Sequence, residues 1–281
     1  GTPLCAIIQN SNTRSADYDR TKNLARPSHA DFTGFVRYQG YNDYRGGGHF
    51  SGRLTAPLVF AGAVAKLALR ERGIFVGAHI LQLGAQKDTP FSQETLTQNA
   101  FDALAEKDFT VLDDEVGERM KALVQEARMN LTSVGGIIQC AVIGMPCGVG
   151  SPDKDNLEGI IARNIFRVPA VKGIEFGLGF GFASAYGHEV NDQMRMDNGK
   201  VVTETNYNGG ILGGISNGMP VVFQAVIKPT SSISREQKTV DLVAMRDSTL
   251  VVKGRHDPCI LSRASVVVES ATALSVLEAL S

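Results

Sequence analysis

Apolar residues recur along this chain with both helical and strand-like spacing, and no linker or low-complexity segment separates the two kinds of run. This order predicts one α+β domain rather than a series of separate units. Helical spacing predicts helices over 55–72, from 113 onward, and over 156–166 and 264–280. Strand spacing predicts strands over 4–9, 134–143, 173–185, 221–228, 239–245 and 250–252.

The composition narrows the class of protein. With 281 residues, 43% of them hydrophobic, the chain can build a core without disulfides or metal. Its net charge of -1 argues against a general nucleic-acid binder. The four cysteines lack C-x-x-C spacing and the five histidines are scattered, which indicates reduced thiols in a cytoplasmic protein without a metal site. Neither a signal peptide nor a run of eighteen apolar residues is apparent, so no membrane association is expected.

The stretch GIEFGLGFGFASAYG, at 173–187, alternates large apolar residues with glycine. A strand with one face of bare glycine lets a flat ligand, or another backbone, approach closely. Tight packing between elements is the favoured interpretation of this stretch taken alone.

Three polar stretches, the first two with runs of glycine, suit a small anionic ligand. RPSHAD, at 26–31, places an arginine, a histidine and an aspartate within six residues, and GGGHFSGR follows. TNYNGGILGGISNG, at 205–218, fits neither the Walker nor the Rossmann pattern, but its backbone amides can face an anion or a ring. KPTSS, at 228–232, offers one cation and three hydroxyls for a phosphate, or simply ends a strand.

GRHDPC, at 254–259, contains a candidate acid or base. Asp257 follows an arginine and a histidine, which favours an acid/base role, although aspartate before proline often caps a turn. A metal site from His256, Asp257 and Cys259 is disfavoured because the three are too close in sequence to converge.

Taken in order, RPSHAD, GGGHFSGRLTA, PAVKGIEFG, TNYNGGILGGISNG, KPTSSI and GRHDPC make nearly the whole chain resemble chorismate synthase. The resemblance implies a lyase of the shikimate pathway, the route to the aromatic amino acids. Its reaction is the anti-1,4-elimination of phosphate from 5-enolpyruvylshikimate 3-phosphate, giving chorismate. Reduced FMN is required without net redox change, and NADPH is a candidate reductant. The implied fold is a β-α-β sandwich, with helices between two antiparallel sheets, in a cytoplasmic homotetramer.

The same resemblance implies roles for individual residues. The implied catalytic residues are His29, as the acid beside the flavin, and Asp257, near flavin N5. The implied substrate-binding residues are Arg26, Arg53 and Arg45. The implied FMN-binding residues are His49, Phe50, Ser51, Ala170, Gly213, Lys228, Pro229, Thr230, Ser231, Ser232 and Arg255.

Two family motifs, G-E-S-H-G and R-R-x-P-G, are absent from residues 1–281. We therefore expect a single domain lacking the family's N-terminal segment, with Arg26, His29 and Arg53 exposed and no turnover by this chain alone. Two alternatives stay open: a catalytically incomplete FMN-binding relative, and another flavin-dependent oxidoreductase. Consumption of stoichiometric reductant would distinguish the second from the elimination.

Overall fold

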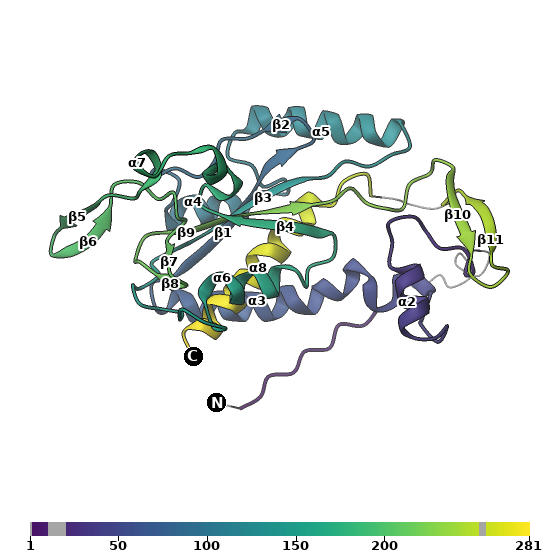
Figure 1. Ribbon diagram of the computed structural model, residues 1–281, viewed down its shortest axis with the longest axis horizontal. Coiled ribbons are helices and arrows are strands. Elements are labelled where there is room, and N and C mark those ends of the chain that lie inside the picture. Colours follow the sequence, from purple (N-terminus) through teal and green to yellow (C-terminus); the bar gives the residue numbers. More distant parts are fainter. Residues whose placement is uncertain (1, 11–20, 253–256) are drawn as a thin grey trace.

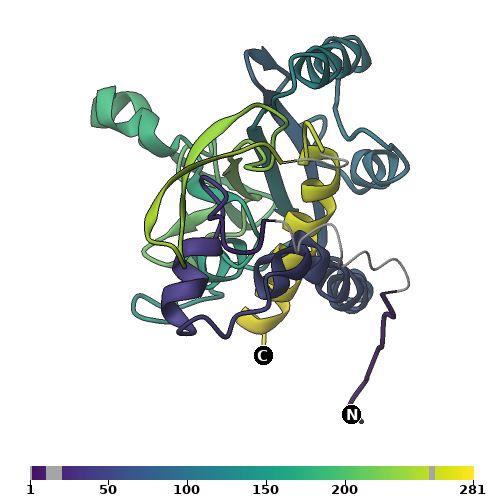
Figure 2. The ribbon, with the colours of Figure 1, turned by 90° about the vertical axis from the view of Figure 1, so that its right-hand side faces the viewer.

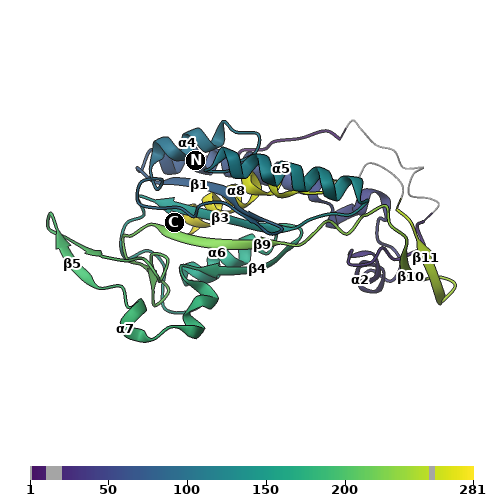
Figure 3. The same ribbon diagram turned by 90° about the horizontal axis from the view of Figure 1, so that it is seen from above.

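The computed structural model describes residues 2–10, 21–252 and 257–281. Its centre is a five-stranded antiparallel sheet of order β2-β1-β3-β9-β4 (Figure 3). The strands are β2 (Gln86–Lys87), β1 (Phe75–Leu83), β3 (Gly136–Ile143), β9 (Val221–Ile227) and β4 (Val171–Phe176). In the register, Gly136 faces Ile227, which in turn faces Val171. The end of β9 and the starts of β3 and β4 therefore lie at the same end of the sheet.

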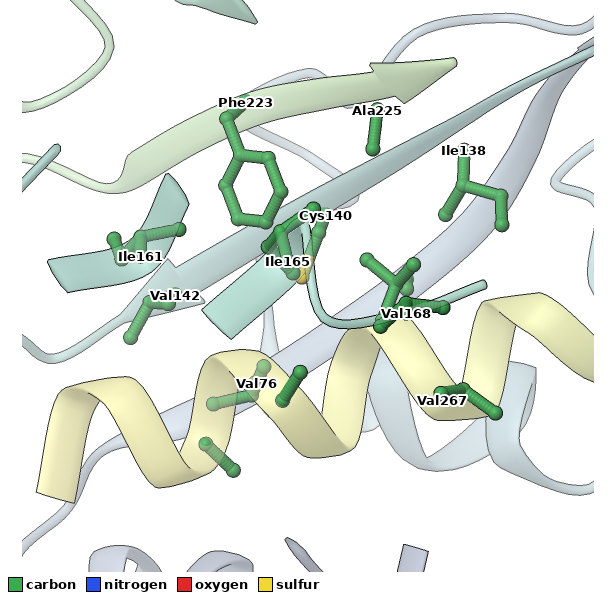
Figure 4. Close-up of a cluster of buried hydrophobic side chains, with 14 of the residues drawn as sticks. Val76, Ile138, Cys140, Val142, Ile161, Ile165, Val168, Phe223, Ala225 and Val267 are labelled. Carbon is green, nitrogen blue, oxygen red and sulfur yellow. The ribbon is translucent and has the colours of Figure 1, made fainter. Parts of the chain in front are cut away.

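Helices form a layer on one face of this sheet. α8 (Leu261–Ala279) packs on β1 and β3, while α3 (Thr55–Arg70) and α6 (Leu157–Ile165) pack on α8 (Figures 1 and 2). α3 approaches α8 closely because Gly62 has no side chain: a Cβ there would lie 2.2 Å from Ser270 Cβ. Burying each large apolar side chain of the core between the layers contributes roughly 1.5–3 kcal/mol. This core includes Val76, Ile138, Cys140, Val142, Ile161, Ile165, Val168, Phe223, Ala225 and Val267 (Figure 4).

Side-chain caps set where several helices begin. α5 (Asp114–Met129) starts after Asp113, whose carboxylate accepts the N–H groups of Glu115 at 2.8 Å and Val116 at 3.4 Å. α6 starts after Asn156, which accepts the N–H of Gly159 at 2.5 Å. The helices predicted from 113 onward and over 156–166 are confirmed as α5 and α6, and those predicted over 55–72 and 264–280 are confirmed as α3 and α8. α4 (Gln98–Ala105), which was not predicted, packs on β1.

Several strand predictions are wrong. Residues 2–10 have no regular secondary structure, and the side chains of Leu4 and Ile7 are exposed. Alternation gives these residues strand propensity, but among the described residues no strand pairs with them. The strands predicted over 239–245 and 250–252 are instead β10 (Gln237–Asp241) and β11 (Arg246–Leu250). They form a hairpin whose turn includes Met245 at a φ of 50°. β1, which lies between β2 and β3 in the sheet, was not predicted.

The glycine-rich stretch is a strand only up to Phe176. Gly177 and Gly179 take φ values of 56° and 55°, which turn the chain out of the sheet into a 3-10 helix, η3 (Gly179–Ser184). A Cβ on Gly177 would lie 1.9 Å from the carbonyl oxygen of Tyr207. The favoured packing interpretation is therefore confirmed at Gly177, where one backbone crosses closely over another.

Replacing Gly177 with alanine is expected to destabilise the protein more than the same replacement of another glycine that also has a positive φ. Gly199 is the matched control, because it takes a φ of 79° and a Cβ there would have open space within 4 Å among the described residues. Gly199→Ala isolates the cost of the positive φ, whereas Gly177→Ala adds a steric clash worth a further 1–3 kcal/mol or so. Urea unfolding measures both, and equal losses would contradict the close backbone approach.

A buried polar network joins the opposite face of the sheet to two loops. His79 Nδ1 lies 3.2 Å from Asp88 Oδ2, and His79 Nε2 lies 3.0 Å from Gln139 Oε1. All three side chains are buried. Asp88 also accepts the backbone N–H groups of Thr89, Leu112 and Asp113 at 2.9, 2.6 and 3.1 Å. These bonds fix the chain that leads into α5.

Smaller parts project from the two ends of the sheet (Figures 1 and 3). One end carries α2 (Asp31–Arg37) and the β10–β11 hairpin. The other end carries α7 (Gly187–Val190), the hairpin of β5 (Met194–Asp197) with β6 (Lys200–Thr203), and the hairpin of β7 (Ile211–Leu212) with β8 (Ile215–Ser216).

The helical stretch Gly52–Arg70, which contains α3, is long and apolar enough to cross a membrane by length and composition alone, and one such helix is weak evidence. Here α3 packs along α8 as part of the helical layer. Its outer side leaves Phe60, Val64 and Leu67 exposed.

Candidate active site

Arg26, His29 and Asp31 form one hydrogen-bonded cluster at the start of α2. The guanidinium of Arg26 binds both carboxylate oxygens of Asp31, with Nε 2.7 Å from Oδ2 and Nη2 2.8 Å from Oδ1. His29 Nδ1 lies 2.8 Å from the same Oδ1. A turn brings the three together: the N–H of His29 donates to the carbonyl of Arg26 at 3.1 Å, and Ser28 takes a φ of 58°. The side chains of Arg26 and His29 are only 15% and 19% exposed, so the expectation that they would be open to solvent is wrong.

The cluster keeps Asp31 ionised. Burial raises the pKa of this carboxyl, but the hydrogen bonds and charges of Arg26 and His29 lower it further, so the pKa of Asp31 lies well below its usual range. Asp31 is therefore a carboxylate, able only to accept hydrogen bonds.

The KPTSS loop after β9 binds the backbone of this cluster. The Nζ of Lys228 and the hydroxyl of Ser231 both donate to the carbonyl oxygen of Ser28, the hydroxyl at 2.8 Å. Lys228 Nζ also lies 3.2 Å from Ser231 Oγ. Two stretches about 200 positions apart in sequence, both singled out as anion-binding candidates, therefore meet directly.

A second connection holds the cluster in place from the β10 side. The N–H of Ala25 donates to the carbonyl of Val240 at 3.2 Å, and the hydroxyl of Thr239 donates to the carbonyl of Ala25. Leu24 forms an antiparallel bridge with Asp241. The loop that carries Arg26 and His29 is thus bound both to β10 and to the KPTSS loop that follows β9.

The triple-glycine turn lies against the ring of His29. It forms a 3-10 helix, η1 (Arg45–Phe50), in which Gly47 takes a φ of 86°. A Cβ on Gly47 would lie 3.5 Å from His29 Cε1 and 3.6 Å from His29 Nε2. The Nε2 edge of the ring therefore faces the glycine turn, while Nδ1 faces Asp31.

The loops beside KPTSS bring Asp257 to the same end of the sheet. The hydroxyl of Ser133 donates to the carbonyl of Thr230 at 2.7 Å, and the N–H of Val134 donates to the carbonyl of Pro258 at 2.8 Å. Asp257 is half-buried and forms an ion pair with Arg263. The hydroxyl of Thr230 is buried, and no hydrogen-bond partner for it exists among the described residues.

Comparisons with known proteins decide the family. A sequence profile of chorismate synthase matches residues 1–280. Chorismate synthase of Dehalococcoides mccartyi is 43% identical over 274 residues, which cover 98% of this chain and 74% of that protein. Chorismate synthase of Thermococcus kodakarensis is 44% identical over 279 residues, or 99% of this chain and 76% of that protein. The chain belongs to the chorismate synthase family. Its activity class is accordingly that of a lyase.

A solved structure supports the same assignment. A crystal structure of chorismate synthase superposes with a TM-score of 0.69 at 26% identity, covering 88% of this chain and 69% of that one. The α+β class expected of the chorismate synthase family is confirmed, with helices packed on antiparallel sheet. In the described residues, the one large sheet has five strands and the other three sheets have two each.

The remaining residues implied by the chorismate synthase resemblance are spread around this site. The carbonyl of Ala170, a residue at a φ of 72°, accepts the N–H of Lys228 at 2.9 Å. Arg53 is exposed, and Ser51 accepts the N–H of Arg53 at 3.2 Å. Phe50 lies 6.5 Å from Tyr38, centroid to centroid. The residues His49 and Pro229 are exposed, and Ser232 is half-buried.

The last three implied residues differ in where they lie. Arg45 is exposed and forms an ion pair with Asp43, its Nε 2.8 Å from Oδ1. Gly213 lies in the turn between β7 and β8, at the end of the sheet away from α2 (Figures 1 and 3). Arg255 lies outside the described residues.

Sequence reasoning did not assign two groups that this site uses. Asp31 was noticed in RPSHAD but given no role, although an acid two residues after a histidine and five after an arginine is the available signal. The carbonyl of Ser28 has no signal in the sequence, because any residue carries one. Among the described residues, no three His, Cys, Asp or Glu side chains are placed to hold a metal ion.

Proposed function

We propose that this protein converts 5-enolpyruvylshikimate 3-phosphate to chorismate and phosphate at the site formed by RPSHAD, the glycine turn and KPTSS. Membership in the chorismate synthase family supports this substrate. The single observation that carries the assignment of the site is the meeting of Lys228 and Ser231 with the Arg26–His29 loop. Such a cluster of cations and hydroxyls suits a substrate with two carboxylates and one phosphate.

The residues present fit reduced FMN as the cofactor. The hydroxyl of Thr230 is buried without a partner in the described part of the chain, which leaves a donor for a phosphate or ring edge. Lys228 and Ser232 add further donors on the same loop. When bound there, reduced FMN would supply electron density for the loss of phosphate, with no net redox change.

The protein's own residues would bind, orient and manage protons. Arg26 and Arg53 would pair with the substrate's anionic groups, and the bond between Arg26 and Asp31 would hold that guanidinium in one orientation. His29 would take up and return a proton at Nε2, on the edge facing the glycine turn. Asp257 would assist removal of the substrate hydrogen from the opposite end of the site. The substrate loses phosphate and a hydrogen in 1,4 relation.

The test is phosphate release by the full-length protein from 5-enolpyruvylshikimate 3-phosphate, without oxygen, with FMN and a chemical reductant. Chorismate and phosphate are expected in equal amounts, without stoichiometric consumption of reductant. Consumption of one equivalent of reductant for each equivalent of product would indicate a different flavin-dependent oxidoreductase. FMN binding without phosphate release would indicate a catalytically incomplete relative.

Replacing Lys228 with alanine is expected to weaken FMN binding about 10-fold or more, the scale of losing one hydrogen bond to a charged group. Lys172→Ala, which removes an exposed lysine on the neighbouring strand β4, is the matched control. Fluorescence titration of FMN measures both variants. Equal affinity in Lys228→Ala and Lys172→Ala would remove Lys228 from the cofactor site.

We further propose that the protein is a cytoplasmic homotetramer and that NADPH is a candidate reductant of its flavin. Light scattering over a wide concentration range tests the assembly, and a monomer throughout would contradict it. Anaerobic oxidation of NADPH by the FMN-loaded protein tests the reductant.

A further inference from the structure

We propose that Asp31 is a positioning residue, which fixes the tautomer of His29 and the orientation of Arg26. The inference rests on the function proposed above, because it assigns a task to a group beside the reacting residues. Asp31 itself is turned toward Arg26 and His29, and it acts through them.

Asp31 has its hydrogen-bonding capacity filled by two residues. It accepts from the backbone N–H of Arg26 at 2.9 Å, from Arg26 Nε at 2.7 Å and from Arg26 Nη2 at 2.8 Å. The fourth contact is His29 Nδ1 at 2.8 Å. A carboxylate offers about four lone-pair positions, so these contacts leave no room for a donor from substrate.

The tautomer of His29 follows from the atoms around Nδ1. Besides Asp31 Oδ1 at 2.8 Å, Nδ1 has Arg26 Nη2 at 3.1 Å. If Nδ1 lacked a proton, its lone pair would face the lone pairs of an ionised carboxylate at the shorter distance. If Nδ1 carries a proton, it donates to Oδ1, and Arg26 Nη2 donates to Oδ1 as well, at 2.8 Å. The second arrangement satisfies every group, so Nδ1 carries the proton.

This choice determines what the other nitrogen can do. In the neutral ring, Nδ1–H leaves Nε2 with a free lone pair, directed toward the glycine turn at Gly47. Nε2 can then take up a proton and return it. Asp31 supports the charged ring that results, because its carboxylate stays bound to Nδ1–H.

An amide side chain at position 31 is expected to reverse the tautomer of His29. Asparagine has one acceptor oxygen and one NH2 group, so the oxygen can serve Arg26 while the NH2 group faces His29. Nδ1 must then accept, and the proton of the neutral ring moves to Nε2. The site loses its free lone pair although the side chain keeps nearly the same shape.

The experiment is nitrogen-15 NMR of the histidine side chains in the full-length protein without ligand, with the His29 signal assigned through His29→Gln. The wild type is expected to show the Nδ1–H tautomer in the neutral ring, and Asp31→Asn the Nε2–H tautomer. Asp197→Asn is the control, because Asp197 also lies near an arginine, 3.7 Å from Arg195, but in the β5–β6 hairpin. A wild-type Nε2–H tautomer, or no change in Asp31→Asn, would overturn the proposal.

Turnover provides a second readout. Asp31→Asn is expected to lower kcat about 10–100-fold, the scale for losing a group that orients a reacting residue. Asp31→Glu, which keeps the charge, should recover part of the loss. If the tautomers behave as expected but the wild type releases no phosphate, the proposed function fails and the role of Asp31 in fixing the ring stands. If the wild type turns over and Asp31→Asn matches it, the positioning role is wrong.

Discussion

Replacing His29 with alanine is expected to slow phosphate release about a hundredfold or more, the usual scale for losing a positioned acid or base. The physical reason is that Nε2 faces the glycine turn, while Nδ1 is held by Asp31. FMN binding should change little, since the hydroxyls of KPTSS remain. Anaerobic phosphate release measures the effect. His188→Ala, which removes an exposed histidine on α7 at the other end of the sheet, is the control.

Asp257→Ala is expected to slow phosphate release by a similar factor, again with FMN binding nearly intact. The bonds from Val134 to Pro258 and from Ser133 to Thr230 hold the chain beside Asp257 at this end of the sheet. Full activity in both His29→Ala and Asp257→Ala would show that the site has been assigned wrongly. A loss in only one of them would remove the other from the proposed pair.

Replacing Asp88 with alanine is expected to lower the free energy of unfolding by about 3–5 kcal/mol, the cost of removing one partner from a buried pair. The change leaves His79 Nδ1 and the N–H groups of Leu112 and Asp113 without their acceptor. Urea unfolding at neutral pH measures the loss. Asp155→Ala, at an exposed position before α6, is the control and should change little. A loss below about 1 kcal/mol for Asp88→Ala would contradict the network.

The contribution of Asp88 to the free energy of unfolding should also depend on pH. Burial raises the pKa of Asp88, but hydrogen bonds from His79, Leu112, Asp113 and Thr89 lower it further, so the net shift is downward. A depressed pKa stabilises the folded state above the unfolded pKa of about 3.9, and this stabilisation is lost as the pH falls through the folded pKa. The difference in unfolding free energy between wild type and Asp88→Ala should therefore be full at pH 7 and should shrink below about pH 4.

The sequence predicted the helices better than the strands. α5 and α6 have side-chain caps at Asp113 and Asn156, so their starts can be found locally. The prediction over 173–185 failed because alternation continues past Phe176, whereas the chain leaves the sheet at Gly177. Only the crossing backbone of Tyr207 shows why the strand ends there. Residues 4–9 alternate equally well but have no paired strand among the described residues, and pairing is a property of the whole fold.

For the site, the sequence analysis singled out two stretches that the structure brings together, but it did not predict how they meet. Lys228 and Ser231 were expected to face a ligand, and both donate to the carbonyl of Ser28. Such a contact depends on backbone position, which residue identity does not encode. The task of Asp31 was missed for a related reason: its neighbours in sequence suggest a cluster, but only distances show that one carboxylate serves both Arg26 and His29.

The hydrogen bonds that join Ala25 and Ser28 to β10 and to KPTSS link residues 200 to 215 positions apart. In an unfolded chain, closing a loop of that length costs roughly 5 kcal/mol of entropy, more than a few hydrogen bonds return. The cost falls sharply once the sheet and α8 have brought β9 and α3 together, because the remaining free loops are then short. We therefore expect the core to form before the loop carrying Arg26 and His29 becomes ordered.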